Sequence, residues 1–194
     1  MKTLEAISKR KSTRSYTPEQ IPEEALETIL KAGSAAPVAM AKYDSLHITV
    51  VQDPELLDRI NKATEEVFFR LLGVRRNMDF GAKTLLFVSS TEVHRPGTDH
   101  ANAGIVMENM VLAATALGID SLILGGAPAA VAGDPELMKA LGIPEGFRKV
   151  FCGEGDSIGA HARFDDLYVL LQNGDGRGEQ TFCVEIHADG EKKK

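Results

Sequence analysis

The sequence predicts an α/β or α+β fold in which helices pack against one layer of β-sheet. Short apolar runs that are typical of buried strands alternate with segments of helical periodicity, and helix exceeds strand. The chain has 194 residues, of which 43% are apolar, so it is long enough to bury one ordinary core. Because it contains no internal repeat and no low-complexity linker, we expect a single domain over residues 1–194.

Two helices are expected near the start of the chain. Thr3–Lys9 has the pattern of a short helix, with Leu4 and Ile7 facing inward. Pro22–Ala32 begins with proline and two glutamates, which favour the first turn of a helix. The apolar residues that share its inward face are Leu26, Ile29 and Leu30.

Two buried strands and a third helix follow. Leu46–Val51 is a β-branched run, and Thr84–Ser89 is a second short apolar run bounded as strands are. Between them, Asp53-Pro54 is expected to cap a helix that extends through Ile60 and beyond Thr64.

The longest predicted element is a helix over Asn102–Leu117, which is rich in alanine and methionine and apolar on most faces. Gly118 is placed to end it as a C-terminal glycine. A helix that is apolar nearly all round is buried on several sides. Since a domain of this size offers limited cover, we expect a subunit interface and therefore a dimer.

The second half of the chain predicts shorter elements. Ile119–Leu124 has the pattern of a strand and leads into Gly125-Gly126. Asp134-Pro135 caps a short helix that ends at Leu141-Gly142, and Val150-Phe151 begins another extended piece.

The net charge of −6 argues against a nucleic-acid surface, which needs a broad basic face. Positive charge is instead concentrated in the first fourteen positions, which fits a small anionic ligand better than a polymer. These basic residues are Lys2, Lys9, Arg10, Lys11 and Arg14.

No apolar run is long enough to span a membrane, and no apolar signal segment is present. Cys152 and Cys183 lack metal-ligand spacing, so we expect free thiols in a reducing cytoplasm. His94 and His100 flank Pro96-Gly97 without a carboxylate at ligand spacing, so no metal site is expected.

The stretch Arg10-Lys11-Ser12-Thr13-Arg14 places three cations and two hydroxyls within five residues. Fixed cations and hydroxyl donors suit a phosphate monoester, so the stretch predicts a phosphate cradle. The alternative is a solvated helix end, because basic residues near a helix C-terminus also complement its dipole.

Four motifs in order resemble those of the flavin-dependent nitroreductase family. The Arg-Lys-Ser-Thr-Arg-Ser-Tyr stretch at 10–16 looks like that family's Arg-Arg-Ser-x-Arg-x-Phe opening, and residues 36–40 resemble its Ala-Pro-Ser-x-x motif. Residues 104–119 resemble its central helix, and residues 141–144 match its late Leu-Gly-Ile-Pro. The resemblance covers residues 3–151.

The resemblance implies an α+β fold, a nitroreductase-like three-layer α/β/α sandwich whose central, mostly antiparallel sheet is flanked by helices. It also implies a homodimer with FMN at the subunit interface. A ping-pong cycle follows from it, in which NADH or NADPH reduces the flavin and the flavin reduces a small acceptor such as a quinone or a nitroaromatic. No catalytic side chain is expected, because FMN carries the chemistry.

The resemblance also implies the ligand contacts. Arg10, Ser12 and Arg14 would hold the FMN phosphate and ribityl chain, with Lys11 contributing. The segment Pro37-Val38-Ala39-Met40 would pack beside the isoalloxazine ring from the other subunit. Gly125 and Gly126 would let the backbone approach the flavin edge, although a flexible turn after a strand is their plainer interpretation.

Two departures from the family pattern stand out. The family usually has Asn or Gln near the pyrimidine edge of the flavin, where this chain has Ala41, Lys42 and Tyr43. Ala41 offers no side-chain hydrogen bond, whereas Lys42 could offset charge on the reduced flavin or simply be solvated.

The acceptor pocket is expected to use apolar residues after Thr64, for which the candidates are Phe68, Phe69 and Leu72.

The second departure is an atypical C-terminal tail at residues 152–194. Within it, Leu167–Leu171 and Thr181–Ile186 look like strands around the Gly-rich Asn173–Gly178. They could form a hairpin or wrap the partner subunit, and a shifted reading frame would also end the resemblance abruptly. Arg163 is the one plausible replacement phosphate ligand. Because the tail carries apolar runs, we expect its removal to lower stability and FMN affinity.

The leading hypothesis is therefore an FMN-dependent NAD(P)H oxidoreductase. A flavin-binding or regulatory protein with little turnover is the alternative, motivated by Ala41–Tyr43 and the tail. The third hypothesis is a structural domain with a cluster of basic residues at one end and no cofactor.

Overall fold

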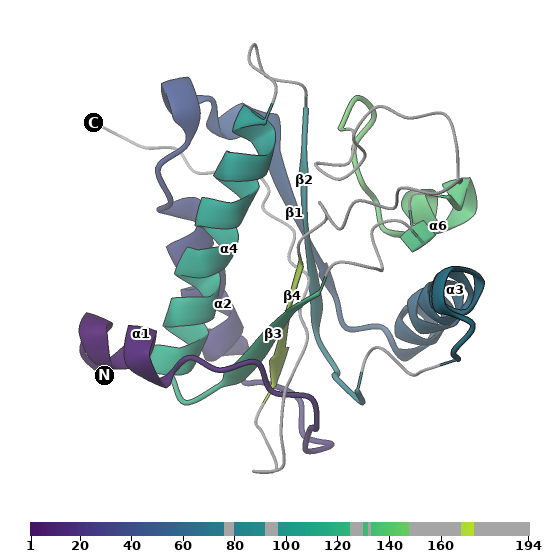
Figure 1. Cartoon of the computed structure of the whole chain (residues 1–194). Coiled ribbons are helices and arrows are strands. Elements are labelled where there is room, and N and C mark those ends of the chain that lie inside the picture. The colour runs from purple at the N-terminus through teal and green to yellow at the C-terminus, as the bar shows by residue number, and fades with distance from the viewer. Residues whose placement is uncertain (76–79, 92–96, 125–129, 132, 148–167, 173–194) are drawn as a thin grey trace.

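The computed structural model describes residues 1–75, 80–91, 97–124, 130–131, 133–147 and 168–172 (Figure 1). The helices of this part are α1 (Thr3–Lys9), α2 (Glu23–Ser34), α3 (Pro54–Leu72), α4 (Thr98–Ala116) and α6 (Pro135–Ala140), and the 3₁₀ turns are η1 (Ala39–Ala41) and η2 (Tyr43–Ser45). The strands are β1 (Leu46–Val51), β2 (Leu85–Ser90), β3 (Asp120–Leu124) and β4 (Tyr168–Gln172).

These four strands form one sheet in the order β1-β2-β4-β3, and every neighbouring pair is antiparallel. β1 and β2 pair along their whole length, from Leu46 opposite Ser90 to Val51 opposite Leu85. β4 lies between β2 and β3, so a strand from the tail completes the interior of the sheet.

Helices cover both faces of this sheet. Figure 1 shows α4 and α2 on one face, with α1 packed against α4, and α3 and α6 on the other face. This arrangement is a three-layer α/β/α sandwich around an antiparallel sheet, which confirms the predicted α+β fold. Among the described residues, no helix combines the length and the apolar character needed to cross a membrane.

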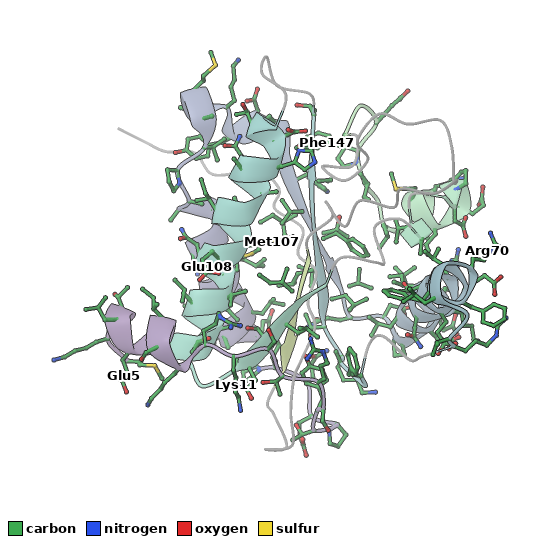
Figure 2. All side chains as sticks on the ribbon, viewed as in Figure 1. Glu5, Lys11, Arg70, Met107, Glu108 and Phe147 are labelled. Carbon is green, nitrogen blue, oxygen red and sulfur yellow. The ribbon has the colours of Figure 1, made fainter. Side chains whose placement is uncertain are left out.

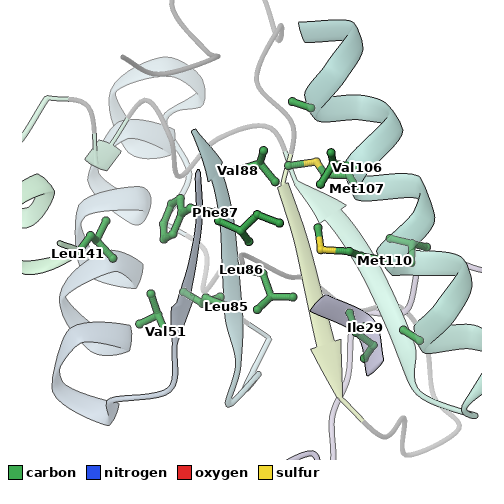
Figure 3. Close-up of a cluster of buried hydrophobic side chains, with 14 of the residues drawn as sticks. Ile29, Val51, Leu85, Leu86, Phe87, Val88, Val106, Met107, Met110 and Leu141 are labelled. Carbon is green, nitrogen blue, oxygen red and sulfur yellow. The ribbon is translucent and has the colours of Figure 1, made fainter. Parts of the chain in front are cut away.

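The core lies in two layers because neighbouring strand residues point to opposite faces. Leu86 and Val88 of β2 face α4, whereas Leu85 and Phe87 face α3 and α6 (Figure 3). Met110 of α4 is fully buried on the first of these faces. Burying a side chain of this size stabilises the fold by about 1.5–3 kcal/mol relative to leaving it exposed.

The predicted strands at Leu46–Val51, Thr84–Ser89, Ile119–Leu124 and Leu167–Leu171 are confirmed to within one residue at each end. The expected extended pieces at Val150-Phe151 and Thr181–Ile186 lie outside the described residues.

The predicted helix caps are confirmed as well. The Asp53 side chain accepts a hydrogen bond from the Leu56 amide at 2.8 Å, and Asp134 accepts one from the Leu137 amide at 3.0 Å. Gly118 follows α4 with φ of 79°, a conformation that glycine adopts without strain. α4 begins at Thr98, one turn before the predicted start at Asn102. The sequence does not predict this first turn, because its residues are polar and show no apolar periodicity.

The predicted inward face of α1 is wrong. Leu4 and Ile7 are 80% and 51% exposed, and Ala6 is the buried residue of this helix. α4 also needs less cover from a second subunit than its composition predicts, because the sheet, α2 and α1 of the same chain cover most of it. Its exposed large apolar residue is Ile105, and Leu117 is exposed directly after its end.

A close approach between α2 and α4 generates the first prediction. A Cβ added at Gly33 would lie 2.8 Å from both Cγ and Sδ of Met110 and 3.5 Å from Cδ1 of Ile48. Overpacking of this kind costs about 1–3 kcal/mol, more than the gain of up to about 1 kcal/mol from alanine in a helix. We expect Gly33→Ala to lower the free energy of unfolding by about 1–2 kcal/mol in urea titrations.

The matched background is Met110→Ala, which removes the two side-chain atoms nearest to the added Cβ. There, Gly33→Ala should be neutral or stabilising, even though Met110→Ala itself costs about 2–5 kcal/mol. An increase in stability on adding Gly33→Ala to the wild-type protein would contradict the close approach.

Candidate functional site

The basic segment near the N-terminus lies along the edge of the sheet. Arg10 ends α1, where its amide donates to the Ala6 carbonyl at 2.9 Å. Ser12 then forms a parallel bridge with Ser121 of β3, and the Thr13 amide donates to the Ser121 carbonyl at 3.2 Å. The chain from Arg10 to Arg14 therefore runs beside β3 in the same direction, toward the end of β3 that precedes Gly125 in the sequence.

The side chains of this segment divide between two sides. Thr13 is fully buried and its hydroxyl donates to Oδ2 of Asp120 at 3.0 Å. Lys11 Nζ lies 3.3 Å from the same oxygen. If side chains alternate along this segment as they do in extended backbone, Arg10, Ser12 and Arg14 are directed away from Asp120. Arg10, Ser12 and Arg14 thus lie in one stretch of chain beside β3, and their convergence on a phosphate stays a prediction.

The positive charges of the segment differ in their partners. Lys9 Nζ lies 2.8 Å from the Glu5 carboxylate, and its hydrogen bond and charge lower the pKa of Glu5. Lys11 is paired with Asp120. Arg10 is half-buried and forms no ion pair with any residue that the structure describes. Figure 2 shows Lys11 at the end of α4 that leads into β3.

The second predicted segment, Pro37 to Met40, lies at the other end of α4. Val38 is buried, and the Ala39 amide donates to Oδ1 of Asn102 at 3.1 Å. Asn102 is 2% exposed, and its Nδ2 is buried without a hydrogen-bond partner among the described residues. Met40 is 76% exposed.

The turn at Met40 is strained. Met40 and Ala41 have φ of 58° and 54°, in the left-handed region. This conformation costs an L-residue other than glycine roughly 1–2 kcal/mol, and asparagine tolerates it better than alanine does. Such strain is concentrated at functional sites, so the exposed turn is a candidate ligand contact.

One protomer does not bring the two segments together. Ala39 is bonded to Asn102 near the start of α4, whereas Ser12 lies beside β3, which follows the end of α4. At a rise of 1.5 Å per residue, Asn102 and the end of the helix are about 21 Å apart. A site that uses both segments therefore needs a second copy of the chain.

Other predicted groups are less informative. Gly125, Gly126, Cys152, Arg163 and Cys183 lie outside the described residues. His100 Nδ1 lies 3.2 Å from the carboxylate of its neighbour Asp99. Within the described part of the chain, no group of three or more potential ligands could hold a metal ion.

The residues suggested for an acceptor pocket belong to α3. Phe68 is half-buried, and the ring of Phe69, which is 41% exposed, lies 4.5 Å from the Arg75 guanidinium carbon. Arg75 also pairs with Glu66 at 3.0 Å. Hydrogen bonds from Arg70 and then Arg75 lower the pKa of Glu66. Since α3 and α1 lie on opposite faces of the sheet, one protomer does not place these aromatic residues beside Arg10–Arg14 (Figure 1).

Two polar residues at these segments were not predicted from the sequence. Asp120 begins a strand and Asn102 lies in an apolar helix, so each interrupts an apolar pattern at a place where burial requires a partner. That interruption is the signal that could have identified them.

Comparisons with known proteins agree with these motifs. Residues 7–153 match the family model described as the nitroreductase family. A curated protein of Archaeoglobus fulgidus, with the provisional name NADH dehydrogenase/NAD(P)H nitroreductase, is 32% identical over 148 residues. That match covers 73% of this chain and 77% of the relative.

Solved structures show the same fold. A nitroreductase with bound FMN from Bacteroides fragilis is 25% identical, with a TM-score of 0.73, and the match covers 100% of this chain and 99% of that one. An FMN-dependent nitroreductase from Clostridium difficile is also 25% identical, with a TM-score of 0.72 and coverage of 93% and 94%.

The strained turn generates the second prediction. Ala41→Gly should relieve the left-handed conformation and raise the free energy of unfolding by about 0.5–1 kcal/mol, even though glycine gains entropy when unfolded. Ala39→Gly, in the same turn but at negative φ, is the matched control and should lower it. Thermal and urea unfolding measure both; a loss of stability in Ala41→Gly would show that position 41 is not left-handed.

Proposed function

The chain belongs to the nitroreductase family, and on this basis we propose that it is a cytoplasmic, homodimeric, FMN-dependent oxidoreductase. The observation that supports the proposal is the attachment of the Arg10–Arg14 segment to β3 through Ser12 and Thr13. Alternation of side chains along that segment would direct two guanidinium groups and a hydroxyl to one side. When bound, FMN would supply the redox chemistry, accepting hydride from NADH or NADPH and passing it to a quinone, nitroaromatic or related small acceptor in a ping-pong cycle.

The donor set fits the phosphate of FMN. Guanidinium groups bind phosphate oxygens in bidentate fashion, and a serine hydroxyl adds a neutral donor. Arg10 suits this role because it is half-buried and has no carboxylate partner among the described residues. Lys11 adds positive charge beside the cradle. We propose Gly125 and Gly126, which follow β3, as the backbone contact to the flavin edge.

The second subunit would supply the remaining contacts. The strained Pro37–Met40 turn lies too far from Arg10–Arg14 in its own chain, so we propose that it covers the isoalloxazine ring of the partner's site. The apolar surface supports this arrangement, since large apolar side chains are exposed on α1, on η1 and on and beside α4. These residues are Leu4, Ile7, Met40, Ile105 and Leu117.

β4 supports a single domain over residues 1–194. It comes from the atypical tail and lies inside the sheet, so the tail contributes to the fold. No side chain is assigned as an acid or a base, because the protein's part is to bind, orient and exclude water.

A flavin-binding protein with little turnover is the second candidate. It is favoured by Ala41, which offers no side-chain donor to the flavin edge. Both candidates predict a yellow protein. Steady-state oxidation of NADH or NADPH with a quinone separates them: FMN binding with no turnover on several acceptors would favour the second, and a protein that stays colourless after adding FMN would contradict both.

The phosphate cradle gives the third prediction. Arg10→Ala should weaken FMN binding by roughly tenfold to a hundredfold, because a charge-assisted hydrogen bond contributes about 1.5–3 kcal/mol. Lys9→Ala is the matched control, since Lys9 is adjacent and basic but is paired with Glu5. Fluorescence titration with FMN measures both affinities, and equal losses in the two variants would contradict the cradle.

The dimer gives the fourth prediction. Ile105→Glu should yield a monomer or an aggregate with reduced FMN binding, because it would bury an unpaired carboxylate in an apolar interface. Thr28→Glu, on the exposed face of α2, should leave the dimer intact. Size-exclusion chromatography with light scattering reports the mass. A folded wild-type monomer that binds FMN would contradict a site shared between two subunits.

A further inference from the structure

We propose that Asp120 is the positioning residue of the phosphate cradle and that Lys11 acts on Asp120 rather than on the phosphate. The inference rests on the proposed FMN binding and adds a residue that the family motifs do not contain. It is carried by one carboxylate oxygen, Oδ2 of Asp120, that receives both the Thr13 hydroxyl and the Lys11 ammonium.

Asp120 selects the register of the segment. Side chains of an extended segment alternate, so a slip of one residue would exchange the two sides of Arg10–Arg14. In the observed register, Thr13 is fully buried and donates to Asp120 at 3.0 Å. A slip of one residue would place either Arg14 or Ser12 at that buried position. Arg14 there would bury a large cation, which is costly, and Ser12 there would move Lys11 to the side away from Asp120. The contacts of Asp120 with Thr13 and Lys11 together therefore favour the register in which Arg10, Ser12 and Arg14 face the ligand.

The backbone attachment of the segment is short. The Thr13 amide donates to the Ser121 carbonyl of β3 at 3.2 Å, and Ser12 forms an isolated bridge to the same strand residue. So short a pairing specifies register weakly by itself. The hydrogen bond between Thr13 and Asp120 lies at the same point of the segment and helps to specify its register on β3.

Lys11 offsets the charge of Asp120. A carboxylate beside a phosphate site opposes anion binding. The Asp120 side chain is 27% exposed, so solvent screens its charge only in part, and Lys11 Nζ at 3.3 Å offsets it. Lys11 thus helps FMN binding by neutralising Asp120. This role differs measurably from a direct contact between Lys11 and phosphate.

The experiment compares FMN with riboflavin, which lacks the phosphate, on the full-length dimer. Asp120→Ala removes both the acceptor for Thr13 and the charge, and it should weaken FMN binding by about tenfold or more while riboflavin affinity stays within about threefold. A loss of stability alone would weaken the binding of both ligands alike. The ratio of the FMN and riboflavin affinities therefore reports the effect of Asp120 on the phosphate contacts. A folded Asp120→Ala protein with the wild-type ratio would overturn the inference.

A second set of variants tests the inference even where Asp120→Ala fails to fold. Asp120→Asn keeps an acceptor oxygen for Thr13 and removes the charge, so FMN affinity should be retained or improved. Lys11→Met alone should weaken FMN binding, whereas adding Lys11→Met to Asp120→Asn should change it by less than about twofold. If Lys11→Met weakens FMN binding as much in the Asp120→Asn background as in the wild-type protein, Lys11 contacts the phosphate directly. That result would overturn its assigned role.

The wild-type titration separates the proposed function from the role of Asp120. Wild-type protein that binds neither FMN nor riboflavin would overturn the proposed function, and the inference with it. Wild-type protein that binds FMN more tightly than riboflavin, with a ratio that Asp120→Ala does not change, would leave the function standing and refute the role of Asp120 alone.

Discussion

Met110 of α4 is fully buried against Gly33 of α2 and near Ile48 of the sheet, and this contact determines where both candidate segments lie. Two helices and a sheet packed this closely have little freedom to slide, because interiors are as dense as organic crystals. Asn102 near the start of α4 holds the Met40 turn, and the strand after its end holds Arg10–Arg14. The length of one buried helix thus sets the spacing between them.

Two of the positive charges in the basic N-terminal segment are paired with carboxylates. Lys9 and Lys11 each meet a carboxylate, at 2.8 Å and 3.3 Å, while Arg10 meets none among the described residues. Exposed ion pairs contribute little to stability, so these pairs matter chiefly for the field that a ligand would meet. Because Lys9 and Lys11 are paired with carboxylates, Arg10 is left as a hydrogen-bond donor for a ligand.

Local signals were predictable from the sequence and non-local ones were not. The β-branched run Leu46–Val51 and the caps Asp53 and Asp134 depend on neighbouring residues alone, and the structure confirms them. Leu4 was misplaced because a seven-residue helix has too few positions to reveal which face is covered. The contact between Thr13 and Asp120 joins residues far apart in the chain, and only the folded topology reveals it.

The central position of β4 has a consequence for biosynthesis. Translation releases the N-terminal strands first, so β1, β2 and β3 leave the ribosome before the strand that belongs between β2 and β3. Until then, β2 and β3 each present an unpaired edge, which is a template for association with other chains. Contacts between distant segments also form slowly. The nascent polypeptide therefore closes its sheet late, and chaperone protection would matter most in that interval.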